Sequence, residues 1–153
     1  MKTEHTDVSG WLRRWGAQSG GGLLEINAQG ISSFTVQQMP MQLTLDIPHQ
    51  QMLLAAIALD EDVSGQPAVM RAMLEFAHLG ERSRHCGVSL AQTGRPVVWL
   101  WHGIALLDET GFDNTLNNFV ASALQCREVL QAALQPAAHA NFGADLPRGM
   151  IRA

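Results

Sequence analysis

The chain has 153 residues and a formal net charge of −4, from 14 acidic and 10 basic residues. This length fits a single domain, and an acidic balance disfavours nucleic-acid binding, which needs a basic surface. Only 16% of the residues are charged, well below the ~25% of an average soluble domain, which suggests that part of the surface lies in contacts. No apolar stretch approaches the ~18 residues of a membrane span and residues 1–10 are polar, so we expect a cytoplasmic protein without a signal peptide or membrane partner.

The N-terminal half of the chain predicts a short helix and then three strands. The helical spacing of Trp11, Leu12 and Trp15 predicts the helix, which the glycines at 20–22 end. In chain order the strands are 31–36, rich in β-branched residues, then 41–47, in which apolar and polar residues alternate strictly, and 52–59, an unbroken apolar run. Such a run is typical of a central strand that is covered on both faces.

The C-terminal half predicts a helix, a hairpin and a last helix. In chain order these are a helix from Gln66-Pro67 to Gly80, strands at 88–90 and 97–107 joined by a turn at Thr93-Gly94, and a helix from about Thr110 to Pro136. Residues 137–153 lack a sustained period and are expected to form a loosely held tail beyond a single domain at 1–136. The fold class is therefore α+β.

Residues with reactive groups do not converge in a pattern typical of an enzyme. His78, His85 and Cys86 come nearest to a metal cluster, but no CxxC or HExxH spacing accompanies them. The glycines at 20–22 lack the ending of a phosphate-binding loop, and Ser89 is not in a nucleophile elbow. We expect neither catalysis nor a metal or cofactor.

Two cysteines and four tryptophans remain to be placed. Cys86 and Cys126 fall in a strand start and a helix interior, where lone cysteines usually act as small buried apolar groups, so no disulfide is expected. Trp99 and Trp101 point to one face of their strand, and the other two tryptophans share one face of the first helix. Core packing and a protein interface are both open for these pairs.

The element order over residues 8–134 resembles that of class I type III secretion chaperones, the Tir chaperone-like or CesT-type family. Patterns of apolar positions and turns carry the likeness, in three stretches. They are Leu23-Leu24-Glu25-Ile26-Asn27-Ala28-Gln29-Gly30-Ile31, residues 41–60, and Gly87-Val88-Ser89-Leu90 through Val97-Val98-Trp99-Leu100 into residues 112–130.

This resemblance implies a homodimer that binds an extended, unfolded N-terminal segment of one or a few secreted effectors and has no cofactor and no turnover. The secretion ATPase is a further partner left open. The effector-binding residues carried over from the family are Leu12, Trp15, Ile31, Phe34, Val36, Leu43 and Leu45. The dimer residues are Met70, Met73, Leu74, Val98 and Leu100, with Trp99 or Trp101.

Two other functions are compatible with the sequence. One is a small-molecule-binding or enzymatic α+β domain whose pocket is lined by Trp99 and Trp101. The other is an adaptor with the same fold and a folded partner. The element order, the acidity and the missing catalytic constellation favour the chaperone. Its binding mode is physically coherent, because an apolar groove beside an exposed strand edge can accept an extended peptide through main-chain hydrogen bonds.

Overall fold

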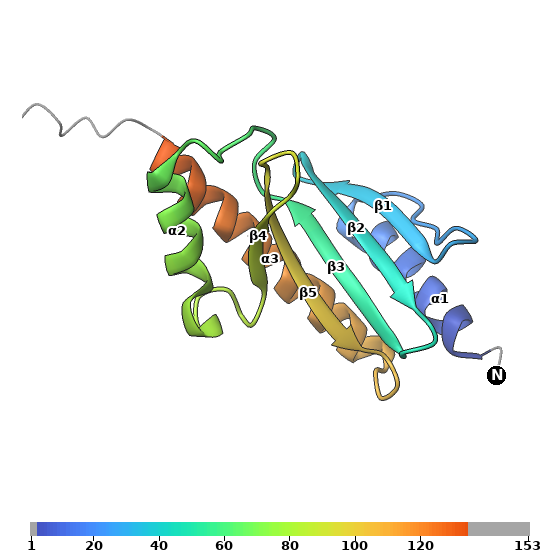
Figure 1. Cartoon of the computed structure of the whole chain (residues 1–153). Helices are drawn as coiled ribbons and strands as arrows, with labels where there is room; N and C mark the ends of the chain where they lie inside the picture. Colours follow the sequence, from blue (N-terminus) through green and yellow to red (C-terminus); the bar gives the residue numbers. More distant parts are fainter. Residues whose placement is uncertain (1–2, 135–153) are drawn as a thin grey trace, which may run out of the picture.

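The computed structural model describes residues 3–134, and side chains from residue 7 onward, as three helices and five strands (Figure 1). In chain order the elements are α1 (Thr3–Ser19), β1 (Ile31–Val36), β2 (Met39–Asp46), β3 (Gln51–Ile57), α2 (Pro67–Ala77) with a short 3-10 turn η1 (His78–Gly80), β4 (Gly87–Leu90), β5 (Pro96–Gly103) and α3 (Glu109–Leu134). The predicted α+β order of helix, three strands, helix, two strands and helix is confirmed. The predicted tail at 137–153 lies outside the described residues.

The five strands form one antiparallel sheet in the order β1-β2-β3-β5-β4 (Figure 1). Alternation along each strand divides the sheet into two faces, because neighbouring side chains point in opposite directions. On β2 the core-facing residues are Met41, Leu43 and Leu45, which lie in the predicted strand, and Met39, which precedes it. Their partners on β3 in the same layer are Met52, Leu54 and Ala56.

The two long helices α1 and α3 lie on one face of the sheet, and α2 lies beside the edge strand β4 (Figure 1). Leu12 of α1 and Phe112, Leu116 and Phe119 of α3 are completely or almost completely buried between the helices and the sheet. Proline at the start of α2 occupies a position where its missing N–H is not needed. The core therefore lies on one side of the sheet only.

The structure corrects three sequence expectations about boundaries. The first helix is 17 residues long because its polar first turns, which offer no apolar period, are helical as well. The turn between β1 and β2 is only Gln37-Gln38, both with positive φ (47° and 66°), so Met39 and Pro40 already belong to β2. Strand β5 ends at Gly103, because Ile104 begins a turn in which the Leu107 N–H bonds to its carbonyl (3.2 Å).

The expectation that the apolar strand at 52–59 is covered on both faces is wrong for this chain. Strand β3 is central in the sheet, as predicted, but ends at Ile57. Its residues Leu53, Ala55 and Ile57 are only half-buried, while Met52, Leu54 and Ala56 lie in the core. The second face of the strand has no helix packed on it among the described residues.

Candidate partner-binding surfaces

The face of the sheet opposite the helices, the open face, consists of alternate residues of all five strands. Its members are Ile31, Ser33, Thr35, Pro40, Gln42, Thr44, Asp46, Gln51, Leu53, Ala55, Ile57, Gly87, Ser89, Val97, Trp99, Trp101 and Gly103. Among these strand residues only Asp46, at the end of β2, is charged. The apolar members lie mainly on β3 and β5, and that part of the face suits contact with another apolar surface.

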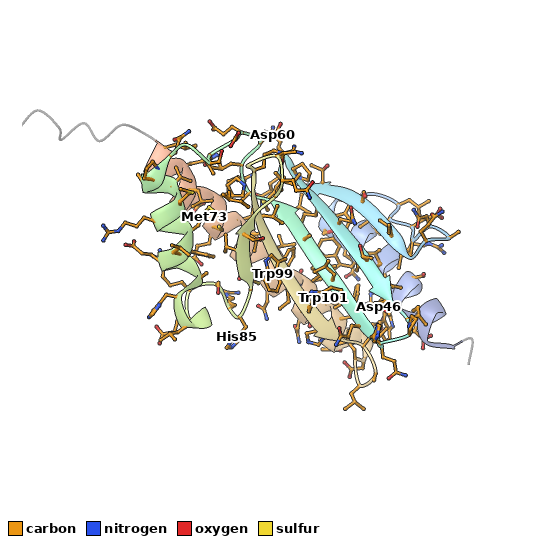
Figure 2. The ribbon with its side chains drawn as sticks, in the orientation of Figure 1. Asp46, Asp60, Met73, His85, Trp99 and Trp101 are labelled. Carbon is orange, nitrogen blue, oxygen red and sulfur yellow. The ribbon has the colours of Figure 1, made fainter. Side chains whose placement is uncertain are left out.

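Two tryptophans occupy the β5 part of the open face (Figure 2). Trp99 is opposite Ala55 on β3 and opposite Gly87 on β4, and Trp101 is opposite Leu53. Their exposed fractions are 37% and 48%, so neither is a core residue of this chain. The predicted common face is confirmed, and of the two readings left open for this pair the structure favours an interface.

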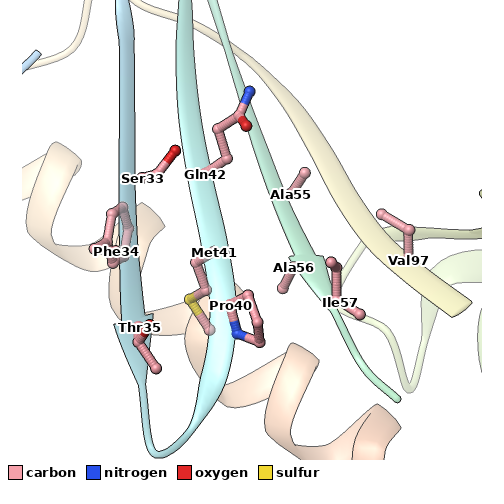
Figure 3. A pocket seen from close by; sticks show the side chains of 10 residues that line it. All are labelled: Ser33, Phe34, Thr35, Pro40, Met41, Gln42, Ala55, Ala56, Ile57 and Val97. Atoms are coloured by element: carbon pink, nitrogen blue, oxygen red, sulfur yellow. The ribbon is translucent and has the colours of Figure 1, made fainter. Parts of the chain in front are cut away.

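A hollow lies on the open face above Ala55, between the β1-β2 hairpin and β5 (Figure 3). Its volume is about 480 Å³. The residues that line it are Ser33, Phe34, Thr35, Pro40, Met41, Gln42, Ala55, Ala56, Ile57 and Val97. We call this site the Ala55 hollow. Its lining contains no ionisable side chain, so it can hold apolar groups but offers no acid or base that could activate the hydroxyls of Ser33 and Thr35.

A second exposed apolar region lies on α2 and the turn that follows it. Leu74 is 75% exposed and Leu79 is 78% exposed. Leu79 also has a left-handed backbone (φ 54°, ψ 8°), a conformation that a leucine rarely adopts. On the same helix Arg71 donates to Glu75 (2.7 Å), which raises the pKa of the guanidinium further. Both leucines are available to a partner molecule.

The residues predicted to bind an effector mostly lie in the core. Leu12 and Leu43 are fully buried, and Trp15, Phe34 and Leu45 are at most 9% exposed. Ile31 and Val36 are half-buried, and of these only Ile31 belongs to the open face. An effector segment on these strands would therefore meet their outward neighbours instead, and the role of the seven residues stays a prediction.

The residues predicted at a dimer interface divide between surface and core. Leu74, Trp99 and Trp101 are exposed, and Met70 is half-buried. Val98 is fully buried and Met73 almost so (Figure 2). Leu100 is half-buried on the core side of β5. Leu74, Trp99 and Trp101 are therefore at the surface of this chain, and the dimer itself stays a prediction.

The tryptophans of α1 differ from those of β5. Trp15 is 4% exposed, donates its indole N–H to Asn117 Oδ1 (2.9 Å), and packs edge-on against Phe34. Trp11 is half-buried against Phe112. Arg14, on the same helix, pairs with Glu109 and Asp113 of α3. Trp11 and Trp15 therefore belong to the contact between α1 and α3.

The two cysteines are buried and free, as expected from the sequence. Burial raises the pKa of the Cys86 thiol. Burial, with a smaller effect of Cys86, raises the pKa of Cys126 to about 12. Both thiols are therefore protonated at neutral pH and poor nucleophiles. Within residues 3–134 the structure brings no three potential metal-ligating side chains together.

The sequence did not predict the Ala55 hollow or the exposure of Leu79. The small size of Ala55 gives no signal in a single sequence, because the hollow depends on which residues of β2 and β5 lie beside it. The small-molecule alternative expected a pocket lined by Trp99 and Trp101, but neither residue lines the Ala55 hollow. Leu79 has no sequence mark, since its left-handed backbone is set by the turn before Gly80.

The model of the Tir chaperone protein (CesT) family matches residues 12–127. A comparison of the sequence with curated proteins finds no match. No helix among the described residues is both long and apolar enough to cross a membrane.

Several solved structures have the same fold. A chain of the ExsC–ExsE complex is 22% identical, with a TM-score of 0.68 over 88% of this chain and 97% of that one. A chain of the HopA1–SchA chaperone–effector complex is 13% identical, with a TM-score of 0.62 over 86% and 98%. A chain of the heterodimeric ExoU–SpcU complex from the type III secretion system of Pseudomonas aeruginosa is 17% identical, with a TM-score of 0.60 over 84% and 98%.

Proposed function

This chain belongs to the Tir chaperone protein (CesT) family, and we propose that it acts as a homodimer that holds an extended segment of an effector protein. The general function, a type III secretion chaperone that binds effectors, follows from the family. The dimer, the extended state of the effector segment, its N-terminal position and the residues that contact it are the proposal. We also propose a cytoplasmic location and a role without substrate turnover.

The apolar part of the open face, on β3 and β5, is the observation that carries this proposal. It exposes two tryptophans and the outward side of a central strand, in a chain with a net charge of −4. A monomer that left Leu53, Ile57, Val97, Trp99 and Trp101 in water would expose an apolar patch, which usually marks a binding site or an aggregation hazard. A chaperone can carry such a face because its partner covers it.

The two halves of the open face suit different partners. The half formed by β1, β2 and β3 contains the Ala55 hollow and ends at the edge strand β1. An extended segment can lie over such a surface, with alternate side chains in pockets and main-chain bonds at the edge. We assign this half to the effector.

The half formed by β5 and β4 suits a second copy of the chain. It contains Trp99 and Trp101, and α2 with its exposed Leu74 lies next to β4 (Figure 1). Large aromatic side chains often supply much of the binding energy of protein interfaces. A two-fold dimer would use each of these residues twice, because the same patch is present on both subunits. The secretion ATPase remains a possible further partner with no surface assigned to it.

Co-expression of the tagged chain with a candidate effector tests the effector half. Leu53→Asp and Ile57→Asp place a charge on the open face without touching the core side of β3. We expect the effector to co-purify with the parent chain and to be lost from the double variant. The matched control is Leu106→Asp, at a fully exposed leucine outside the sheet.

Circular dichroism and urea unfolding must show that both variants are folded. Normal co-purification by the folded double variant would contradict the assignment of this half to the effector. Substitution of Phe34 or Leu43 is unsuitable for this test, because both side chains are buried and their loss would destabilise the fold as well as any binding surface.

A further inference from the structure

We propose that the Ala55 hollow receives one aliphatic side chain of the bound effector segment, and that Gly87 keeps it open by giving Trp99 another place to lie. This inference rests on the proposed function and adds a specificity pocket to it. It concerns a residue on β3 and a glycine on the far edge strand β4, two strands away.

The hollow exists because Ala55 is short and neither of its long cross-strand neighbours covers it. Ala55 pairs with Gln42 on β2 and with Trp99 on β5. Gln42 lines one side of the hollow, where its amide donates to Thr44 Oγ1 of the same strand (3.0 Å), and Trp99 is not among the lining residues. The methyl group of Ala55 alone cannot fill the space between two such long side chains.

Trp99 lies over β4, where Gly87 has no side chain. Gly87 is the cross-strand partner of Trp99, and a Cβ at position 87 would overlap with the six-membered part of the indole ring. Any larger residue at 87 would displace the ring. The other direct neighbours of Trp99 on this face are Val97, Trp101 and Ala55, of which Ala55 is the smallest. The displaced ring would therefore move towards the hollow.

The lining of the hollow indicates its occupant. Pro40, Ile57 and Val97 form an apolar wall, and the polar lining residues Ser33, Thr35 and Gln42 are uncharged (Figure 3). Charged groups would lose their hydration here without gaining a partner. The volume of about 480 Å³ exceeds that of a whole leucine, isoleucine or methionine residue, so size does not exclude any of them and the apolar lining decides the class of occupant. We therefore assign the hollow to an aliphatic residue of an extended effector segment.

Titration with N-acetyl-leucine methylamide, followed by NMR, tests the pocket without knowledge of the effector. We expect a dissociation constant in the millimolar range, as is usual for so small a ligand, with shifts centred on the amides of Ala55, Ile57 and Val97. N-acetyl-glycine methylamide should cause no such shifts. The Ala55→Leu variant should bind the leucine probe at least about tenfold more weakly, since its side chain fills the hollow. Ala132→Leu, the same change at an exposed site on α3, is the matched control.

Gly87→Ala separates the role of the glycine from that of the hollow floor. The backbone at Gly87 does not need a positive φ, so alanine is tolerated in the strand and only the Trp99 ring must move. We expect a shift of the Trp99 indole N–H signal and weaker binding of the leucine probe by about threefold or more. Gly103→Ala, on β5 where a Cβ meets nothing within 4 Å, should change neither signal.

Three results would overturn the inference. They are unchanged probe binding in a folded Ala55→Leu variant, probe shifts spread over other surfaces, and a Gly87→Ala variant in which Trp99 moves but binding does not weaken. If these occur while an effector still co-purifies with the parent chain, the proposed function stands and the pocket alone fails. If no effector co-purifies but the leucine probe binds as described, the pocket stands and the proposed function fails.

Discussion

Replacement of Leu74 by alanine should weaken the proposed homodimer strongly and leave the fold intact. Leu74 lies in the middle of α2, where 75% of its surface is exposed, so its side chain contributes little to the core of its own chain. Alanine is the best helix former, so α2 should not be weakened. Any large effect on association must therefore come from contacts that Leu74 makes with another molecule.

The size of the effect follows from the exposed fraction and from symmetry. Leucine to alanine removes three carbon groups, worth about 0.8 kcal/mol each when they are buried. With 75% of the residue still exposed in the free chain, interface burial gives about 1.5–2 kcal/mol per copy. A two-fold interface loses the contact twice, or about 3–4 kcal/mol, which raises the dimer dissociation constant roughly 100- to 1,000-fold.

Sedimentation equilibrium over a range of concentrations measures this constant directly. Leu23→Ala is the matched control, because Leu23 is 72% exposed and lies in the segment after α1, far along the chain from α2. A dissociation constant for Leu74→Ala within about threefold of the parent value would refute the assignment of α2 to the interface. A parent chain that stays monomeric at all concentrations would refute the homodimer itself.

Three further predictions concern the core. Leu43→Ala should lower the unfolding free energy by about 2–5 kcal/mol in urea titration, because the side chain is fully buried; a change below 1 kcal/mol, roughly the cost of a surface substitution, would contradict the register of β2. Trp15→Phe should cost about 1–2 kcal/mol in the same assay, because Asn117 loses its indole donor; no change would mean that water replaces it. The fold favours the protonated Cys126 thiol, so the contribution of Cys126 to the unfolding free energy should be constant below pH ~9 and then fall by up to about 1.4 kcal/mol per pH unit towards pH ~12. In Cys126→Ala the unfolding free energy should fall less between pH ~9 and pH ~12 than in the parent chain. The same pH dependence in both proteins would show that the fold does not raise the pKa of this thiol.

Local patterns were sufficient to predict most of the fold. The alternation over 41–47 predicted Met41, Leu43, Leu45 and Ile47 as one buried layer, because alternate side chains of a strand share a face. The first three are buried, but β2 ends at Asp46 and Ile47 is 40% exposed. Pro67 and the apolar stripe that follows it placed α2 correctly, because the first turn of a helix tolerates proline and helical spacing aligns the apolar side chains. Boundaries failed where the signal was weak, as in the polar first turns of α1, which have no apolar period to mark them.

The candidate site could be predicted only in part, because it depends on which strands become neighbours. The common face of Trp99 and Trp101 follows from strand geometry alone. That Trp99 lies over Gly87 and leaves Ala55 uncovered requires the pairing of β5 with β4 on one side and with β3 on the other. Alternation also does not say which of the two faces of a strand the chain's own helices cover. The resemblance assigned Phe34 and Leu43 to an effector groove, both side chains are buried in this chain, and their part in effector binding stays a prediction.

The wrong expectation about β3 has a physical explanation that supports a partner. An apolar run such as 52–57 is typical of a strand with both faces buried, and here Leu54 and Ala56 are buried while Leu53 and Ile57 are only half-buried. A strand adapted to one wet face would carry polar residues at those outward positions, as β2 does with Gln42 and Thr44. The composition of β3 is therefore that of a strand covered twice, once by α1 and α3 of its own chain and once, we infer, by another polypeptide.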